Sequence, residues 1–146
     1  MDTNTLISSQ LWEGNESRIF DLILEGKVEL LISEDIIIEF EEVLSRQYFV
    51  DKLKDKELDL EGIKSNILGC ATLVEPVEKV EVVKDDPEDN KILECALVEM
   101  PDFIISGNAH LLKLKNFKGV EIITSRRFLD IFEKEMKTSK EKRGSF

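Results

Sequence analysis

The 146-residue sequence predicts a single α/β domain with a short, mainly parallel sheet. Two observations lead to this prediction. Apolar runs of strand length alternate with longer segments whose apolar residues recur at helical spacing, and this alternation is typical of parallel strands connected by helices. The chain is also long enough for one domain with its own core and too short for two comfortable ones.

Helices are expected where apolar residues recur at helical spacing between capping and breaking residues. Asn15 and Gly26 bound the first such segment, Ser33 can cap the second, and Pro76 ends the third. The expected helices span residues 15–25, 34–46, 63–75, 86–100, 108–114 and 126–137. Short apolar runs predict strands at 28–33, 102–107 and 120–125, with a further extended piece at 79–83 and a charged linker or short helix at 51–62.

The composition is that of a cytoplasmic globular protein. Hydrophobic residues make up 42% of the chain and charged residues 35%. No apolar run approaches the roughly 18 residues of a membrane span, and no secretory signal is expected at the N-terminus. Cys70 and Cys95 fall in apolar helical patterns, so free buried thiols are expected rather than a disulfide. We expect one domain over residues 1–137 and a polar C-terminal tail over residues 138–146.

Charge is distributed unevenly along the chain. The formal net charge is −11, yet residues 111–146 hold 10 basic against 5 acidic residues. An acidic body with a basic C-terminal end could hold a cationic cofactor in one place and contact phosphates in another. Solubility alone explains much of the same pattern, so the asymmetry leaves both interpretations open.

Acidic and polar residues stand near the carboxyl ends of predicted strands, where functional groups collect in parallel sheets, and at the starts and edges of helices. Asp2, Glu39 and Asp89 supply three carboxylates at such positions. Ser106 and Asn108 stand at the end of a predicted strand. Mg²⁺ and Mn²⁺ prefer oxygen ligands of these kinds. Each acid alone also fits a solvated surface position, and it is their joint placement that favours a metal site.

Five segments of the chain carry recognisable motifs. They are DTNTLIS (2–8), SEDIIIEFEEVLSRQYF (33–49), DDPEDNKILECAL (85–97), DFIISGNAHLLKL (102–114) and VEIITSRRFL (120–129). Together, and in this order, they resemble the PIN domain family. The resemblance spans nearly the whole chain and is closest to the VapC-like toxin branch of prokaryotic toxin–antitoxin modules.

The resemblance implies a three-layer α/β/α sandwich that cleaves RNA with one or two Mg²⁺ or Mn²⁺ ions. Asp2, Glu39 and Asp89 match the family's first, second and third acids and would be the catalytic metal ligands. Asn108 replaces the fourth acid and would be a weaker ligand, because its carbonyl oxygen carries no charge. Asn4 and Ser106 would support the site. Besides the RNA substrate, the resemblance implies a small antitoxin and a second copy of the chain as partners, with no membrane.

The N-terminus departs from the family pattern. In PIN domains a buried apolar strand leads into the first acid, whereas Met1 alone precedes Asp2 here. We therefore expect a sheet whose first strand is truncated. A dimer partner or a neighbouring segment could fill the resulting gap.

Other functions stay open from the sequence. Asn108 and the truncated strand favour a degenerate PIN domain that binds RNA or a protein without cleavage, whereas the retention of all three acids favours the enzyme. The segment DTNT is also similar to the opening of haloacid dehalogenase phosphatases. That function is disfavoured because Asn4 stands where the phosphatases need a second aspartate for acid–base chemistry. His110, the one histidine of the chain, fits a surface position or the rim of the site.

Overall fold

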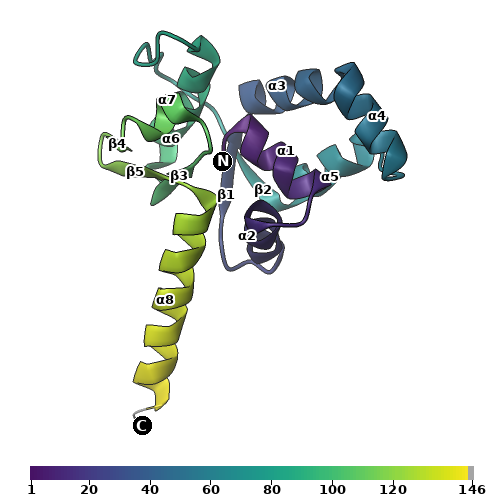
Figure 1. The fold of residues 1–146 in the computed structure, drawn as a ribbon. Coiled ribbons are helices and arrows are strands. Elements are labelled where there is room, and N and C mark those ends of the chain that lie inside the picture. Colours follow the sequence, from purple (N-terminus) through teal and green to yellow (C-terminus); the bar gives the residue numbers. More distant parts are fainter. Residues whose placement is uncertain (145–146) are drawn as a thin grey trace.

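The computed structural model describes the backbone of residues 1–144 and the side chains of residues 1–138. Helices and short strands alternate along it (Figure 1). In chain order the elements are α1 (Thr3–Leu11), α2 (Asn15–Leu24), β1 (Leu30–Ser33), α3 (Glu34–Leu44), α4 (Gln47–Asp55), α5 (Leu60–Cys70), β2 (Ala71–Val74), the 3-10 turn η1 (Pro87–Asp89), α6 (Asn90–Glu99), β3 (Phe103–Ile105), α7 (Ala109–Leu112), β4 (Asn116–Phe117), β5 (Val120–Ile123) and α8 (Ser125–Gly144).

The strands form two separate, mainly parallel sheets. β1 pairs with β2 in parallel, with Leu30 opposite Ala71, and β3 pairs in parallel with β5, with Phe103 opposite Glu121. The two-residue β4 adds an antiparallel edge to β5. The predicted short, mainly parallel sheet is therefore confirmed. Among the described residues, however, β1 and β3 pair with no strand on their remaining edges, so the sheet is divided in two.

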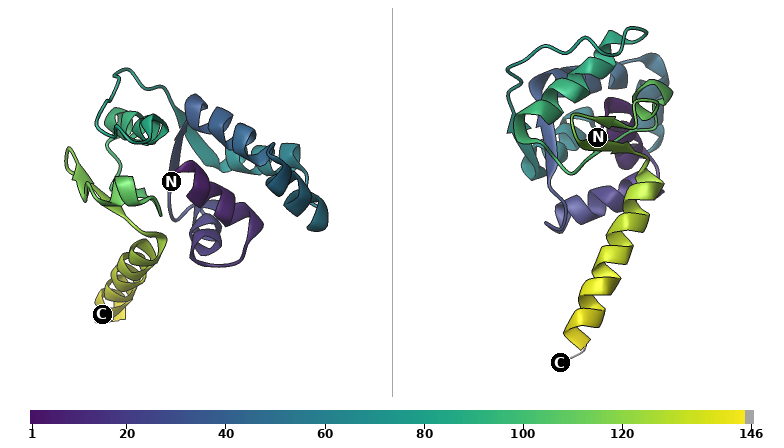
Figure 2. Two further views of the ribbon diagram at one scale, coloured as in Figure 1. Left: turned by 45° about the horizontal axis from the view of Figure 1, so that its top comes forward. Right: turned by 90° about the vertical axis from the view of Figure 1, so that its left-hand side faces the viewer.

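Helices cover both sides of the β1–β2 pair (Figure 2). α6 contacts the two strands from one side, while α3 contacts β1 and α5 contacts β2 from the other. α1 packs against both α2 and α3, and α2 also contacts α8, whose C-terminal part projects away from the body of the molecule. This packing buries one apolar core, whose most deeply covered members include Leu6, Ile19, Phe40, Leu93 and Leu111.

One expected helix is shorter than the sequence pattern predicts. The prediction of a helix over residues 63–75 is wrong beyond Cys70, where Ala71–Val74 form β2 instead. Thr72 and Val74 are β-branched and favour an extended backbone, and pairing with β1 supplies their ladder of hydrogen bonds. α1 and β4 are elements that the sequence patterns did not indicate.

The segment at residues 79–83 belongs to no strand, because side chains of α6 take the place of a neighbouring strand. The side-chain carbonyl of Asn90 accepts from the N–H groups of Val82 at 3.2 Å and Val83 at 2.8 Å, and its amide donates to the carbonyl of Val83 at 2.8 Å. The carboxylate of Glu94 accepts from the N–H of Val80 at 3.1 Å. These bonds hold the loop that leads into η1.

Both cysteines are free, as expected, with Cys95 buried and Cys70 half-buried. None of the helices in the part of the chain that the structure describes has the length and hydrophobicity to span a membrane. The backbone of α8 runs to Gly144. The division into a domain over residues 1–137 and a polar tail over residues 138–146 stays a prediction, since the side chains of residues 139–146 lie outside the described part.

Replacing Asn90 with alanine removes three hydrogen bonds to the backbone of the 79–83 loop. A buried polar group left without a partner costs roughly 1–3 kcal/mol, so we expect Asn90→Ala to lower the free energy of unfolding by about 2–4 kcal/mol. Urea denaturation followed by circular dichroism measures this change.

The control for this variant is Asn66→Ala, at an exposed position of α5, which should change the free energy of unfolding by less than about 0.5 kcal/mol. An Asn90→Ala variant as stable as the parent would show that other contacts hold the loop.

Candidate active site

Asp2 joins the start of α1 to the end of β3. One carboxylate oxygen accepts from the N–H of Thr5 at 2.9 Å and so caps α1, and the other accepts from the hydroxyl of Ser106. The amide of Asp2 donates to the carbonyl of Ile105 at 3.1 Å. These contacts leave Asp2 only 6% exposed. The polar residues at the N-terminus therefore begin a helix and at the same time place a carboxylate at the end of a strand.

A chain of hydrogen bonds leads from Asp2 to Asp89. The buried hydroxyl of Ser106 donates to Asp2 and accepts from the N–H of Asn108 at 2.9 Å. The side-chain amide of Asn108 points at Asp89 Oδ1, 3.4 Å away, while its carbonyl oxygen caps α7 by accepting from the N–H of His110 at 2.8 Å. Asp89 is itself buried at the end of η1. One network thus connects two of the predicted acids with two of the predicted polar residues.

Glu39 reaches the same region from α3. It is half-buried, and the hydroxyl of Thr3 donates to Glu39 Oε2 at 2.9 Å. Thr3 directly follows Asp2 and is the first residue of α1, so the start of this helix positions both carboxylates. Thr3 was not selected from the sequence. The one feature that could have pointed to it is its hydroxyl group, directly after the candidate acid Asp2. We refer to Asp2, Glu39 and Asp89 as the acidic cluster.

The carboxyl group of Asp89 lies in an electrostatically unfavourable place. Burial raises its pKa to about 6, with further contributions from the negative charges of Asp86 and Asp2. Glu39 adds to the shift, and His110 opposes it. The Oδ2 atom of Asp89 is buried and has no hydrogen-bond partner among the described residues. A buried carboxylate oxygen without a donor is destabilising unless a cation compensates its charge.

The carboxylate of Glu39 is also destabilised by burial and by neighbouring negative charges. Burial raises its pKa, the hydrogen bond from Thr3 opposes that effect, and the negative charges of Glu88, Asp86 and Asp2 add to the rise. Asp86 therefore acts on two members of the cluster, although sequence reasoning did not select it. Its own side chain caps η1 by accepting from the N–H of Glu88 at 3.2 Å.

Asn4 and His110 lie outside the network of the cluster. Asn4 is exposed on α1, and its side chain hydrogen-bonds to none of the described residues, so its supporting role stays a prediction. His110 is exposed on α7, with its Nδ1 3.5 Å from a carboxylate oxygen of Asp85. Because His110 also influences the pKa of Asp89, it lies at the rim of the cluster.

Comparison with known proteins identifies the family. A family model described as the PIN domain matches residues 1–110, which is most of the chain and includes every member of the acidic cluster and Asn108. The chain belongs to the PIN domain family. PIN domains are generally nucleases and generally use divalent metal ions. No curated protein and no solved structure matches the chain.

The donor set of this PIN domain suits a hard divalent cation by its chemistry. Carboxylate oxygens are preferred ligands of Mg²⁺ and Mn²⁺, and the orphaned Oδ2 of Asp89 together with the mutual repulsion of the acids would be relieved by positive charge. Within residues 1–138, however, no three acidic, histidine or cysteine side chains converge closely enough to form a finished metal centre. A bound ion would therefore have to draw the carboxylates of the cluster closer together.

Replacing Asp89 with asparagine should stabilise the metal-free protein. Folding raises the pKa of Asp89 from 3.8 to about 6, so above pH 6 the folded state carries a charge that the unfolded state accommodates better. We expect Asp89→Asn to increase the free energy of unfolding at pH 7 on the order of 1–3 kcal/mol. The gain should shrink as the pH falls from 6 to 4, because the folded parent then binds a proton at Asp89.

Urea titrations of both proteins between pH 4 and pH 7, in EDTA, measure this dependence. Asp55→Asn, at an exposed position of α4, is the matched control and should be neutral across the range. A loss of stability in Asp89→Asn at pH 7 would contradict the unfavourable environment that we assign to the carboxylate.

Proposed function

We propose that this PIN domain is a metal-dependent endoribonuclease that hydrolyses RNA phosphodiesters with Mg²⁺ or Mn²⁺ bound at the acidic cluster. The observation that carries the proposal is the buried Oδ2 of Asp89, which lacks a hydrogen-bond partner and interacts electrostatically with the carboxylates of Asp2 and Glu39. Such a concentration of uncompensated negative charge is costly to an apoprotein and is typical of a cation site. Asn108 would serve as a fourth, weaker ligand.

The protein's own groups hold the proposed ligands in place. Ser106 and the start of α1 orient Asp2, and Thr3 orients Glu39. When bound, the divalent ion would supply positive charge to the scissile phosphate and make a neighbouring water more acidic. With a pKa of about 6, Asp89 is mostly ionised at pH 7 and competes for a proton below pH 6. Binding of the ion should therefore weaken as the pH falls through 6.

An acidic chain must overcome repulsion to bind RNA. A cation at the cluster would offset the local part of that repulsion. Exposed basic residues follow the Asn108 position in the chain and would contact the phosphates on either side of the cleaved bond. They are Lys113, Lys115, Lys118, Arg126 and Arg127.

We further propose that the protein is the toxin of a toxin–antitoxin module and acts in the cytoplasm, with a small antitoxin and a second copy of the chain as partners. The likeness of its motifs to the toxin branch of the family supports this role. Two free cysteines accord with a reducing compartment.

Cleavage of a mixed RNA panel in the presence of EDTA, Mg²⁺ or Mn²⁺ tests the proposed activity. We expect cleavage with either ion and none with EDTA. Asp89→Asn should lower the rate at least about 100-fold, because it removes a charged metal ligand without removing volume. The measurement is the rate of product formation on denaturing gels.

Asp55→Asn is again the matched control and should cleave at the parental rate, since its carboxylate is exposed on α4. Full activity in Asp89→Asn would remove Asp89 from the site. Cleavage that persists in EDTA would contradict the metal dependence.

A PIN domain that binds RNA without cleaving it is the second candidate. It is favoured by the absence of a converged metal centre in residues 1–138 and by Asn108, whose side-chain amide, rather than its carbonyl, points at Asp89. Metal-independent RNA binding by a folded protein that produces no cleavage products would support this candidate over the enzyme.

Replacing Asn108 with aspartate should strengthen the proposed metal site. The variant adds a fourth carboxylate beside Asp89, so we expect Mn²⁺ to bind about tenfold more tightly at pH 7.5, as affinity rises with ligand charge. Electron paramagnetic resonance of free Mn²⁺ measures the dissociation constant. Asn66→Asp, on the exposed face of α5, is the matched control, and an equal gain in both variants would mean that only the net charge of the protein matters.

A further inference from the structure

The β4–β5 hairpin and its surroundings are basic, in contrast to the chain as a whole. Residues 107–127 hold five basic residues and one acidic residue, whereas the formal net charge of the chain is −11. Lys113, Lys115 and Lys118 are exposed, and none of them forms an ion pair with a described residue. The hairpin lies at the edge of the molecule, on the opposite side from α4 (Figures 1 and 2). These three cations are therefore accessible to a negatively charged partner.

The turn of this hairpin has a backbone that lysine rarely adopts. Phe117 pairs with Val120, so Lys118 and Gly119 form a two-residue connection between β4 and β5. Their φ angles are 48° and 90°, and tight hairpin turns commonly require such positive values at both central positions. Glycine adopts a positive φ without penalty, and asparagine is the residue usually preferred at the first position. The Cβ atom of Lys118 makes the same backbone unfavourable.

Lys115, just before β4, has the same feature. Its φ is 63°, its N–H donates to the carbonyl of Leu112 at 3.1 Å, and its carbonyl accepts from the N–H of Ile122 at 2.9 Å. Hydrogen bonds on both sides thus hold this lysine in a left-handed conformation. We call residues 115–119 the lysine turn. Unfavourable backbone conformations that the surrounding structure enforces are common at binding sites.

Protection of a sheet edge does not by itself explain the lysine turn. β4 is the outer strand of its sheet, and lysines on an outer strand hinder pairing with the sheets of other chains. That protection requires charge on the strand, but not at the two positions where the backbone is left-handed. Asparagine or glycine would fold more readily at Lys115 and Lys118. A ligand that needs positive charge explains why lysine stands at both positions.

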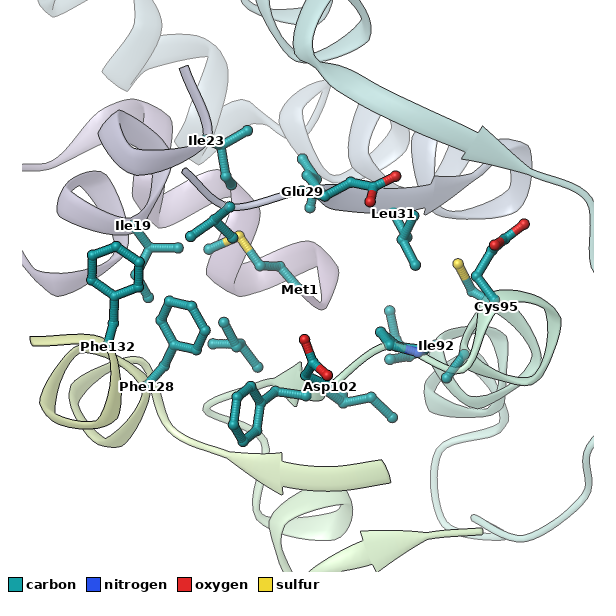
Figure 3. Close-up of a pocket in the computed structure, with 18 of the residues that line it drawn as sticks. Met1, Ile19, Ile23, Glu29, Leu31, Ile92, Cys95, Asp102, Phe128 and Phe132 are labelled. Atoms are coloured by element: carbon teal, nitrogen blue, oxygen red, sulfur yellow. The ribbon is translucent and has the colours of Figure 1, made fainter. Parts of the chain in front are cut away.

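The cavity between β1 and β3 does not suit an anionic ligand. It has a volume of about 470 Å³ and largely apolar walls, and the carboxylates of Glu29 and Asp102 are among the groups that line it (Figure 3). The lysine among its lining residues, Lys27, is paired with Glu25 at 2.9 Å. An anion would be repelled there, whereas the lysine turn offers complementary charge.

The lysine turn and the acidic cluster lie at opposite ends of β5. The N–H of Ser106, directly after β3, donates to the carbonyl of Ile123 at 3.0 Å, so the C-terminal end of β5 lies beside the network of Asp2. Lys118 precedes the other end of the strand. At about 3.3 Å per residue, the four residues of β5 span roughly 13 Å. An anion that reaches both places must be an extended chain, as an RNA strand is.

We propose that the lysine turn binds a phosphate group of the RNA strand at a distance from the cleaved bond, through the ammonium groups of Lys115 and Lys118. The inference deepens the proposed function, because it assigns two of the basic residues to one phosphate site, and it rests on RNA as the substrate. Phosphate contacts add affinity for RNA of any sequence, since they carry no information about the bases.

Binding of a fluorescein-labelled 12-nucleotide RNA in EDTA tests the proposal without cleavage. Fluorescence anisotropy at several KCl concentrations gives the dissociation constants of the full chain and of its Lys115→Asn and Lys118→Asn variants. Each variant should bind roughly threefold to tenfold more weakly at low salt, and the slope of log Kd against log salt concentration should fall by about 0.7. Asparagine tolerates a left-handed backbone, so the urea midpoint of each variant should equal or exceed that of the parent.

Lys54→Asn is the matched control, because it removes the same charge from an exposed position of α4 on the opposite side of the molecule (Figure 1). It should change the dissociation constant less than about twofold. Lys118→Arg keeps the charge and should bind RNA as the parent does. An equal loss of affinity in Lys54→Asn, or an unchanged salt slope in the two turn variants, would overturn the proposal.

A 12-residue polyglutamate peptide distinguishes RNA from an acidic protein as the ligand. Binding of this peptide as tightly as of the RNA would overturn the proposal and assign the lysine turn to an acidic partner protein. Because these measurements are made in EDTA, they do not depend on cleavage. RNA that binds at the lysine turn but is not cleaved when Mg²⁺ or Mn²⁺ is added would contradict the proposed nuclease and leave the phosphate site in place.

Discussion

The hydrogen bonds of Asp2 are the contacts on which both the fold and the candidate site depend. Its carboxylate caps α1 and accepts from Ser106, and its amide donates to Ile105 at the end of β3. Because β1 and β3 do not pair in the described residues, the two halves of the sheet rely on such cross-contacts. The cap also sets the first turn of α1 and with it the hydroxyl of Thr3, which holds Glu39. One aspartate therefore orders a helix, ties it to a strand and positions a second acid.

The charged carboxylates of the acidic cluster lower the stability of the metal-free protein, whereas the proposed binding of a cation requires them. A buried carboxylate with a pKa of about 6 and an unpartnered oxygen costs the apoprotein free energy at neutral pH, and a neutral side chain of the same shape at Asp89 would avoid that cost. Functional sites commonly retain such unfavourable groups because the charge is needed for binding. Asp86, which caps η1, and Glu88, which lies within it, increase the repulsion on Glu39 further. A cation bound among these carboxylates would offset their mutual repulsion and so remove this cost.

Sequence patterns predicted the strands β1, β3 and β5 and most helices, because apolar periodicity, caps and breakers act locally. They did not predict β2, since Ala71 and Val74 fit a helix face equally well until β1 is present to pair with them. The bond from Thr3 to Glu39 joins residues 36 positions apart and depends on how α1 packs against α3. Family motifs could select Asp2, Glu39 and Asp89, but the buried, unpartnered oxygen of Asp89 follows from tertiary packing that no motif encodes.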